Sequence, residues 1–251
     1  MIPQLKSEWL KLRTMRTTWG LLVASVAMVA FIVIVLSLPL ENAGGSGSPS
    51  DAGVTAETVI SFGGMAQLFV LALGVLASAG EFRHQTITPT LLARPRRLVV
   101  ITAKTAVCAL AGFIYGIVTG AVATAGAAIL VSFDRVGGEV TAGDAIGGVM
   151  ASGATTAAWA ALGVGTGMLV RNQVVALVAS IAYLFVVDSL LQLLVPSVWK
   201  WLPSGAADAV TGGLEESGAL DSRALGGIVL VGWVAAVAVA AAELLRRRDV
   251  S

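Results

Sequence analysis

Six long apolar stretches divide the chain, separated by shorter polar or charged segments. Their bounds are about 19–40, 59–79, 105–132, 145–170, 174–195 and 224–245. A bilayer core of about 30 Å needs roughly 20 apolar residues in a helix, and each stretch reaches that length. The pattern therefore predicts an all-α polytopic membrane protein with six transmembrane helices. The third stretch is longer than required, so we expect either one tilted helix or a helix with a broken end.

A basic amphipathic segment, residues 1–18, precedes the first span. Its apolar residues recur at three- and four-residue spacing, and they are Ile2, Leu5, Trp9 and Leu12. Its polar side carries the cations Lys6, Lys11, Arg13 and Arg16. Such a helix lies in the membrane interface, with cations near lipid headgroups. We expect Trp9, Lys11, Arg13 and Arg16 to make these contacts, and residues 19–251 to form a single transmembrane domain.

The distribution of lysine and arginine predicts the orientation of the spans. If the N-terminus is cytoplasmic, 13 of the 16 basic residues lie on the cytoplasmic side, and only Arg135, Lys200 and Arg223 lie outside. Cytoplasmic loops of membrane proteins carry this excess of cations. The bias therefore predicts a multi-pass protein of the cell membrane with both termini in the cytoplasm.

Composition excludes several classes of protein. With 57% hydrophobic residues, 12% charged residues and a mean hydropathy of +0.88, the chain does not resemble a soluble domain. Its single cysteine, Cys108, and single histidine, His84, exclude an internal disulfide and a zinc site built from several imidazoles. We therefore expect no metal site, and we reject an intramembrane metalloprotease despite the adjacent Glu215 and Glu216. Nothing in the composition indicates binding to nucleic acid.

Small residues mark two predicted helix-packing faces. Gly112, Gly116 and Gly120 recur every four residues in the third span, and Gly163 and Gly167 do so in the fourth. Glycine at this spacing allows helix backbones to approach closely. The pattern fits packing within the chain or an interface between subunits.

Asp188 is the one unambiguous carboxylate within a predicted span. An acid within the bilayer is costly, so its usual explanation is functional, and here that means substrate or proton handling. A neutral form, or a hydrogen bond to a neighbouring helix, is the alternative.

The segment 80–104, between the second and third spans, contains residue types that a basic membrane anchor does not need. Glu81 and Arg83 lie at the end of a span, Pro89 and Pro95 interrupt any long helix, and a basic cluster precedes Lys104. Anchoring at the cytoplasmic face needs cations, but it does not need these acids and prolines. The segment is therefore our candidate contact with a soluble partner.

The order of residues in this segment resembles the permease subunits of ABC-2 transporters. The matching stretch begins at Gly80 and contains the predicted coupling-loop residues Glu81, Phe82, Arg83, His84, Thr86, Leu91, Leu92, Pro95, Arg96, Arg97 and Lys104. The opening run from Ser7 to Thr14 is similar to the N-terminal helix of that family, and Leu202 to Ala206 resembles its last external loop.

The resemblance implies a dimer, either of this chain or with a similar permease, driven by separate ATPase subunits that dock on segment 80–104. ATP and magnesium would bind those subunits, because this sequence contains no G-x-x-x-x-G-K-[ST] phosphate loop. We expect export of an amphiphilic substrate by a subunit that is not itself an enzyme. A proton- or ion-coupled secondary transporter that uses Asp188 is the alternative.

Overall fold

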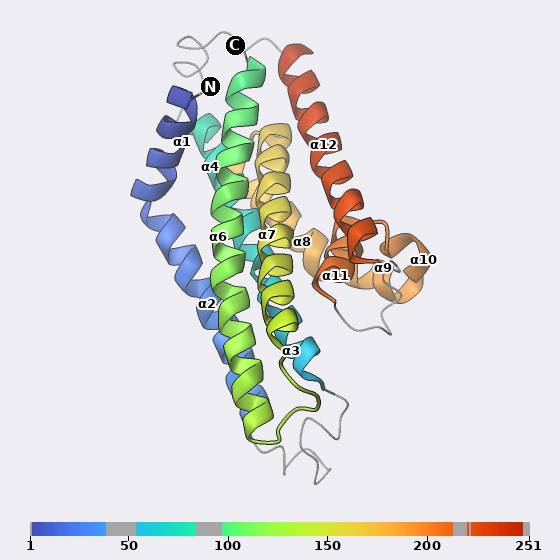
Figure 1. Ribbon diagram of the computed structural model, residues 1–251. Coiled ribbons are helices and arrows are strands. Elements are labelled where there is room, and N and C mark those ends of the chain that lie inside the picture. The colour runs from blue at the N-terminus through green and yellow to red at the C-terminus, as the bar shows by residue number, and fades with distance from the viewer. Residues whose placement is uncertain (1, 39–53, 84–96, 213–219, 221, 248–251) are drawn as a thin grey trace.

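The computed structural model describes residues 2–38, 54–83, 97–212, 220 and 222–247 (Figure 1). These residues are almost entirely helical, and six helices or helix series are long and apolar enough to cross a membrane. This confirms the predicted fold class. The spans are α2 (Arg16–Ser37), α3–η1–α4 (Ala56–Ser61, Phe62–Ala66 and Gln67–Arg83), α6 (Arg97–Ser132), α7 (Ala142–Val170), α8–η2–α9 (Gln173–Ala182, Tyr183–Val187 and Asp188–Leu194) and α12 (Arg223–Arg247).

Three spans form the centre of the bundle and three lie at its edge. About half of the most apolar stretch is buried in α3–α4, α6 and α7, whereas only 11–17% is buried in α2, α8–α9 and α12. Helix α7 packs against both α4 and α6, and α2 lies along the outer side of α6 (Figure 1). The three peripheral helices therefore present most of their apolar surface outwards, where lipid or another subunit would meet it.

Glycines set the close approach of the central helices. A Cβ placed at Gly116 of α6 would lie 2.1 Å from Thr156 Oγ1 and 2.3 Å from Ser152 O of α7. Gly112 and Gly120 face the same helix, and Thr156 Oγ1 donates a hydrogen bond to Gly112 O at 2.8 Å. The α6 glycine face thus packs against α7, within the chain.

A second glycine face joins α7 to α4. A Cβ at Gly163 would lie 2.2 Å from Leu71 O, and one at Gly167 would lie 2.2 Å from Ser78 Oγ. Gly74 of α4 faces back towards α7, where a Cβ would lie 2.2 Å from Ala160 O. The two predicted glycine faces consequently hold α7 between its two neighbours.

The third span is one continuous helix of 36 residues, α6. The second and fifth spans, by contrast, are interrupted. A 3₁₀ segment, η1, separates α3 from α4 and contains Gly63 and Gly64, while a π-helical segment, η2, separates α8 from α9. Such irregular segments within helices often mark hinges or functional sites.

Two short connections are built from local hydrogen bonds. Arg171, in the left-handed conformation at φ 55°, ends α7, and Asn172 Oδ1 caps α8 by accepting from Val174 N and Val175 N. At the other end of α7, Thr141 and Asp144 form a capping box. The caps at Arg171 and Asn172 explain how a link of two residues can join α7 to α8.

The segment after the fifth span folds back onto the bundle. It forms α10 (Pro196–Trp199) and α11 (Pro203–Thr211), each with proline in its first turn. Most residues of α11 are buried, because this helix packs on α12 and α7.

Candidate functional site

A cluster of four charged side chains joins three helices at one end of the bundle. Lys104 of α6 contacts Glu8 Oε2 of α1 (Ile2–Thr14) at 2.6 Å and Glu81 Oε1 of α4 at 3.0 Å. Lys11 of α1 contacts Glu8 Oε1 at 2.8 Å and Glu81 Oε1 at 3.0 Å. Lys104 also donates to Ala77 O at 3.2 Å. We call these four residues the charge cluster.

Three members of the charge cluster are buried, with exposed fractions of 3% for Glu8, 8% for Glu81 and 2% for Lys104. Lys11, by contrast, is exposed. Two carboxylates and two ammonium groups balance in charge, as buried ions must if they are to remain ionised. The cluster is therefore a neutral, hydrogen-bonded junction between α1 and the helix ends that flank residues 84–96.

The helices position the cluster by simple spacing. Glu8 and Lys11 are three residues apart on α1 and so lie on the same face. Glu81 lies in the last turn of α4, and Lys104 lies about two turns into α6. Helix α4 ends and α6 begins at the end of the bundle where α1 lies (Figure 1), and there the ion pairs join the three helices.

The cluster fixes the charge state of α1. Burial alone would raise the pKa of Glu8, but Lys104 and Lys11 hold that pKa below its ordinary value. Burial alone would lower the pKa of Lys11, whereas its contacts with Glu8 and Glu81 raise that pKa above its ordinary value. Both groups are therefore charged throughout the neutral range.

The structure brings together two of the predicted coupling-loop residues, Glu81 and Lys104. Both ends of segment 80–104 are helical, since α4 continues to Arg83 and α6 begins at Arg97. Phe82, Arg83 and Arg97 are placed by their backbone only. The remaining predicted residues, His84, Thr86, Leu91, Leu92, Pro95 and Arg96, lie outside the described residues, as does the metalloprotease pair Glu215 and Glu216.

Sequence analysis missed the role of Glu8, and it placed Lys11 at the membrane interface alone. Glu8 lies between Lys6 and Lys11 as an acid in an otherwise basic helix. This exception to the pattern was the feature of the sequence that could have indicated an ion pair. On α1 the most deeply buried described residues are Glu8 and Leu12. The inner face of α1 is thus bound to the protein through charge as well as through apolar contact.

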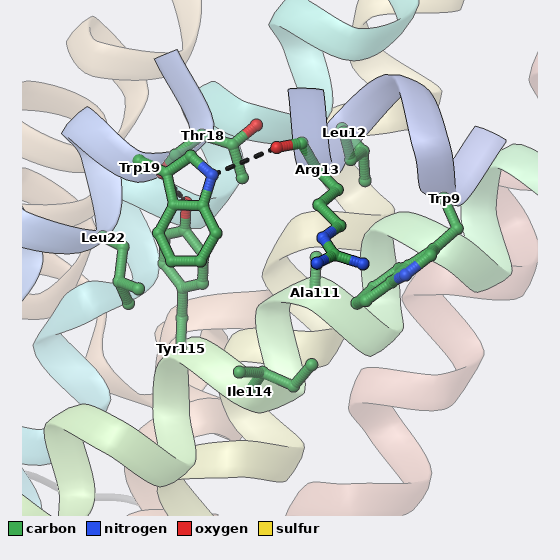
Figure 2. Close-up of a pocket in the computed structure, with 9 residues that line it drawn as sticks. All are labelled: Trp9, Leu12, Arg13, Thr18, Trp19, Leu22, Ala111, Ile114 and Tyr115. Carbon is green, nitrogen blue, oxygen red and sulfur yellow. Dashed lines mark hydrogen bonds between the residues drawn. The ribbon is translucent and has the colours of Figure 1, made fainter. Parts of the chain in front are cut away.

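Two of the other predicted interface residues, Trp9 and Arg13, line a pocket at the bend between α1 and α2. Figure 2 shows Trp9, Arg13, Trp19 and Tyr115 around this pocket, which has a volume of about 240 Å³. Trp19 Nε1 donates to Arg13 O at 3.1 Å, and Tyr115 Oη donates to Thr18 O. Arg16, in the first turn of α2, is exposed. These bonds hold the bend between α1 and α2 against α6.

Asp188 lies at a second cavity, far along the chain from the charge cluster. Trp199 Nε1 of α10 donates to Asp188 Oδ1 at 3.0 Å. Asp188 is therefore hydrogen-bonded to a neighbouring short helix, and this bond leaves its expected role in substrate or proton handling open. Among the described residues no group of three or more histidine, cysteine, aspartate or glutamate side chains is arranged to hold a metal ion.

Comparison with protein families matches residues 4–187 to the family described as ABC-2 family transporter protein. The match covers more than half of the chain, including α1, the charge cluster and the first four spans. The chain belongs to the ABC-2 transporter family. A search of curated proteins finds no match.

Membership in the ABC-2 family confirms the resemblance drawn from segment 80–104. The chain is a multi-pass membrane protein and the membrane component of an ABC transporter. ABC-2 membership also implies an ATPase partner and gives no support to the secondary-transporter alternative.

Proposed function

We propose that this chain is the permease subunit of an ATP-driven exporter in the cell membrane. A separate ATPase subunit, which carries ATP and magnesium, docks on segment 80–104 at the cytoplasmic face, where both termini also lie. Two permeases, identical or similar, pair in the membrane. The substrate is amphiphilic, because the spans offer apolar surface with few polar side chains.

The charge cluster carries this proposal. An ATPase that pushes on residues 84–96 acts on the end of α4 and the start of α6, and Glu81 and Lys104 join those two helix ends to each other and to α1. Buried, hydrogen-bonded ion pairs resist rearrangement because separating them leaves an uncompensated buried charge. The three helices therefore move as one body when the partner moves.

That movement reaches the rest of the bundle through two connections. The glycine faces join α7 to α4 and α6, so a tilt of the helix pair displaces α7. In the second span the 3₁₀ segment η1 separates α4 from α3, and a segment of this kind is suited to bending. Alternating access then consists of the cytoplasmic half rocking about η1 while the partner hydrolyses ATP.

Pull-down of the tagged chain from its native membrane tests the docking proposal. We expect a P-loop ATPase to co-purify with the wild type. We expect this association to weaken at least tenfold in the double variant Arg83→Ala, Arg96→Ala, because the partner loses two charge-assisted contacts.

The matched control is Arg135→Ala, Lys200→Ala, which removes two cations that lie outside in the proposed topology. Size-exclusion chromatography establishes that each variant is folded. Docking elsewhere is indicated if the two double variants retain the ATPase equally, and the proposed function fails if folded wild-type protein purifies without any ATPase.

A further inference from the structure

We propose that the cavity beside Asp188 binds the amine headgroup of an amphiphile. The inference rests on the proposed function, because it names the substrate class of the transporter. The cavity has a volume of about 260 Å³ and lies between the second span, α7, α9 and the short helices α10 and α11. Its polar lining includes Gln67, Thr155, Asp188, Gln192, Trp199 and Ser204.

The position of the cavity in the fold is the first observation. The cavity is bordered by η1 of the second span and, at Asp188, by the residue that directly follows the π-helical segment η2. Irregular backbone at membrane depth is tolerated where it is buried in protein or lines a cavity. The irregular segment of the second span and the residue that follows the irregular segment of the fifth span therefore border one site, as expected of a binding site rather than a packing defect.

The charge of the lining is the second observation. Asp188 and Asp208 both line the cavity, and none of its described lining residues is a lysine or arginine. Asp188 and Gln192 are four residues apart and so share one face of α9. Trp199, only 3% exposed, fixes the Asp188 carboxylate through its indole nitrogen. An anionic group held in this way favours a cationic, hydrogen-bond-donating ligand.

An unpartnered buried hydroxyl is the third observation. Thr155 of α7 is 1% exposed, it lines the cavity, and its Oγ1 has no hydrogen-bond partner among the described residues. Buried polar groups nearly always have a partner, and such an exception calls for one that the protein does not supply. An amine in the cavity would supply it, because an ammonium group donates up to three hydrogen bonds.

The size of the cavity indicates that it holds a headgroup rather than a whole ligand. Pockets for drug-sized molecules measure about 300–1,000 Å³, so this cavity is small for such a ligand. The α9 helix that carries Asp188 also carries Leu190, Leu193 and Leu194, which are 51–77% exposed. The ligand is therefore an amphiphile whose amine enters the cavity while its hydrocarbon chain lies against apolar surface outside.

Binding of three probes with equal chains tests this proposal without any ATPase. The purified permease in lipid nanodiscs is titrated with octylamine, octanol and octanoate, and partition into empty nanodiscs is subtracted. We expect the wild type to bind octylamine about tenfold more tightly than octanol, because the ammonium forms charged hydrogen bonds. We expect octanoate to bind more weakly than either.

Two variants and one control identify the residues responsible. Asp188→Asn keeps an oxygen for the Trp199 indole but removes the charge, and we expect it to lose the preference for octylamine. Thr155→Val removes the buried hydroxyl, and we expect it to weaken octylamine binding several-fold while unfolding no earlier than the wild type. The control, Asp134→Asn, changes an exposed acid in the left-handed region, where asparagine is well tolerated, and we expect it to retain the preference.

Equal binding of octylamine and octanol to the wild type would overturn the proposal, and so would an unchanged preference in Asp188→Asn. The results of this binding experiment and of the pull-down can be interpreted independently. If no ATPase co-purifies but the preference for octylamine depends on Asp188, the amine site stands and the ATP-driven mechanism fails. If an ATPase co-purifies and the preference is absent, only the amine site fails.

Discussion

At the scale of single residues, the charge cluster shows what buried ions do in this protein. A buried ion pair adds little net stability compared with apolar side chains of similar volume, but the loss of one partner is strongly destabilising. The buried Lys104 bridges the carboxylates of Glu8 and Glu81 at 2.6 and 3.0 Å, and the exposed Lys11 contacts both carboxylates as well. The cluster therefore specifies where α1 lies more than it adds to the free energy of unfolding.

Replacing Lys104 tests that interpretation. In Lys104→Met we expect the free energy of unfolding to fall by about 3–5 kcal/mol, because two buried carboxylates would share only the partly exposed Lys11. Thermal unfolding in detergent measures the change. The control Lys6→Ala removes an exposed cation from α1 and should shift the unfolding temperature very little. An unfolding temperature equal to that of the wild type would show that the cluster is not buried as described.

The same cluster predicts a pH dependence with two limits. Because the pKa of Glu8 is lowered, its stabilising contribution is complete above pH 4.5 and is lost as the pH falls through the lowered pKa. Because the pKa of Lys11 is raised, its contribution is complete below pH 10.5 and is lost as the pH rises through the raised pKa.

Differences in unfolding temperature between the wild type and two variants measure these limits. For Glu8→Gln, we expect a difference that is constant near neutrality and shrinks in acid. For Lys11→Met, we expect a difference in unfolding temperature from the wild type that shrinks only above pH 10.5. A Glu8→Gln difference that persists unchanged deep into acid would contradict the assignment of Glu8.

At the scale of helices, packing around α7 depends on the absence of side chains. The Cβ positions at Gly116 and Gly163 fall 2.1–2.2 Å from atoms of the facing helix, closer than any side chain can approach. A polar bond accompanies this approach, since Thr156 Oγ1 reaches Gly112 O across the interface. The glycine faces therefore determine the spacing of α4, α6 and α7.

Gly116→Ala is the sharpest test of helix spacing. We expect it to lower the free energy of unfolding by about 1–3 kcal/mol, because the added methyl group forces α6 away from α7. Gly232→Ala is the control, since nothing lies within 4 Å of the corresponding Cβ on α12. That substitution should be neutral or stabilising, because alanine favours helix. Equal effects of the two substitutions on thermal unfolding would contradict the close packing.

Across the complete bundle, the charge cluster and the Asp188 cavity lie in different regions. The charge cluster lies at the end where α4 finishes and α6 starts, whereas the Asp188 cavity lies among η1, α9, α10 and α11. The central helices α4 and α7 connect the two regions through their glycine contacts. In the proposed mechanism, a movement that the ATPase starts at the charge cluster would reach the cavity through these helix contacts.

Cysteine labelling in intact cells tests the orientation of the molecule. In a Cys108→Ala background, we expect Arg135→Cys, between α6 and α7, to react with an impermeant maleimide. We expect Lys6→Cys on α1 to react only after the cells are opened, because the proposed topology puts the basic end in the cytoplasm. Labelling of Lys6→Cys in sealed cells would reverse the predicted topology.

The sequence by itself determined the number of spans, the all-α class and the family, because span length and segment 80–104 are local properties of the chain. It also identified the glycine positions, although it left open which helices they join.

Only the tertiary structure decided which charges meet. Glu8 and Lys104 are separated by 96 residues, and no local pattern relates them. The same holds for the Asp188 cavity, which draws residues from the second, fourth and fifth spans and from the helices that follow them. Periodicity in the sequence shows which face of a helix is apolar. The partner of a polar side chain, by contrast, is determined only when helices pack together. Both candidate sites consist of polar side chains whose partners lie on other helices.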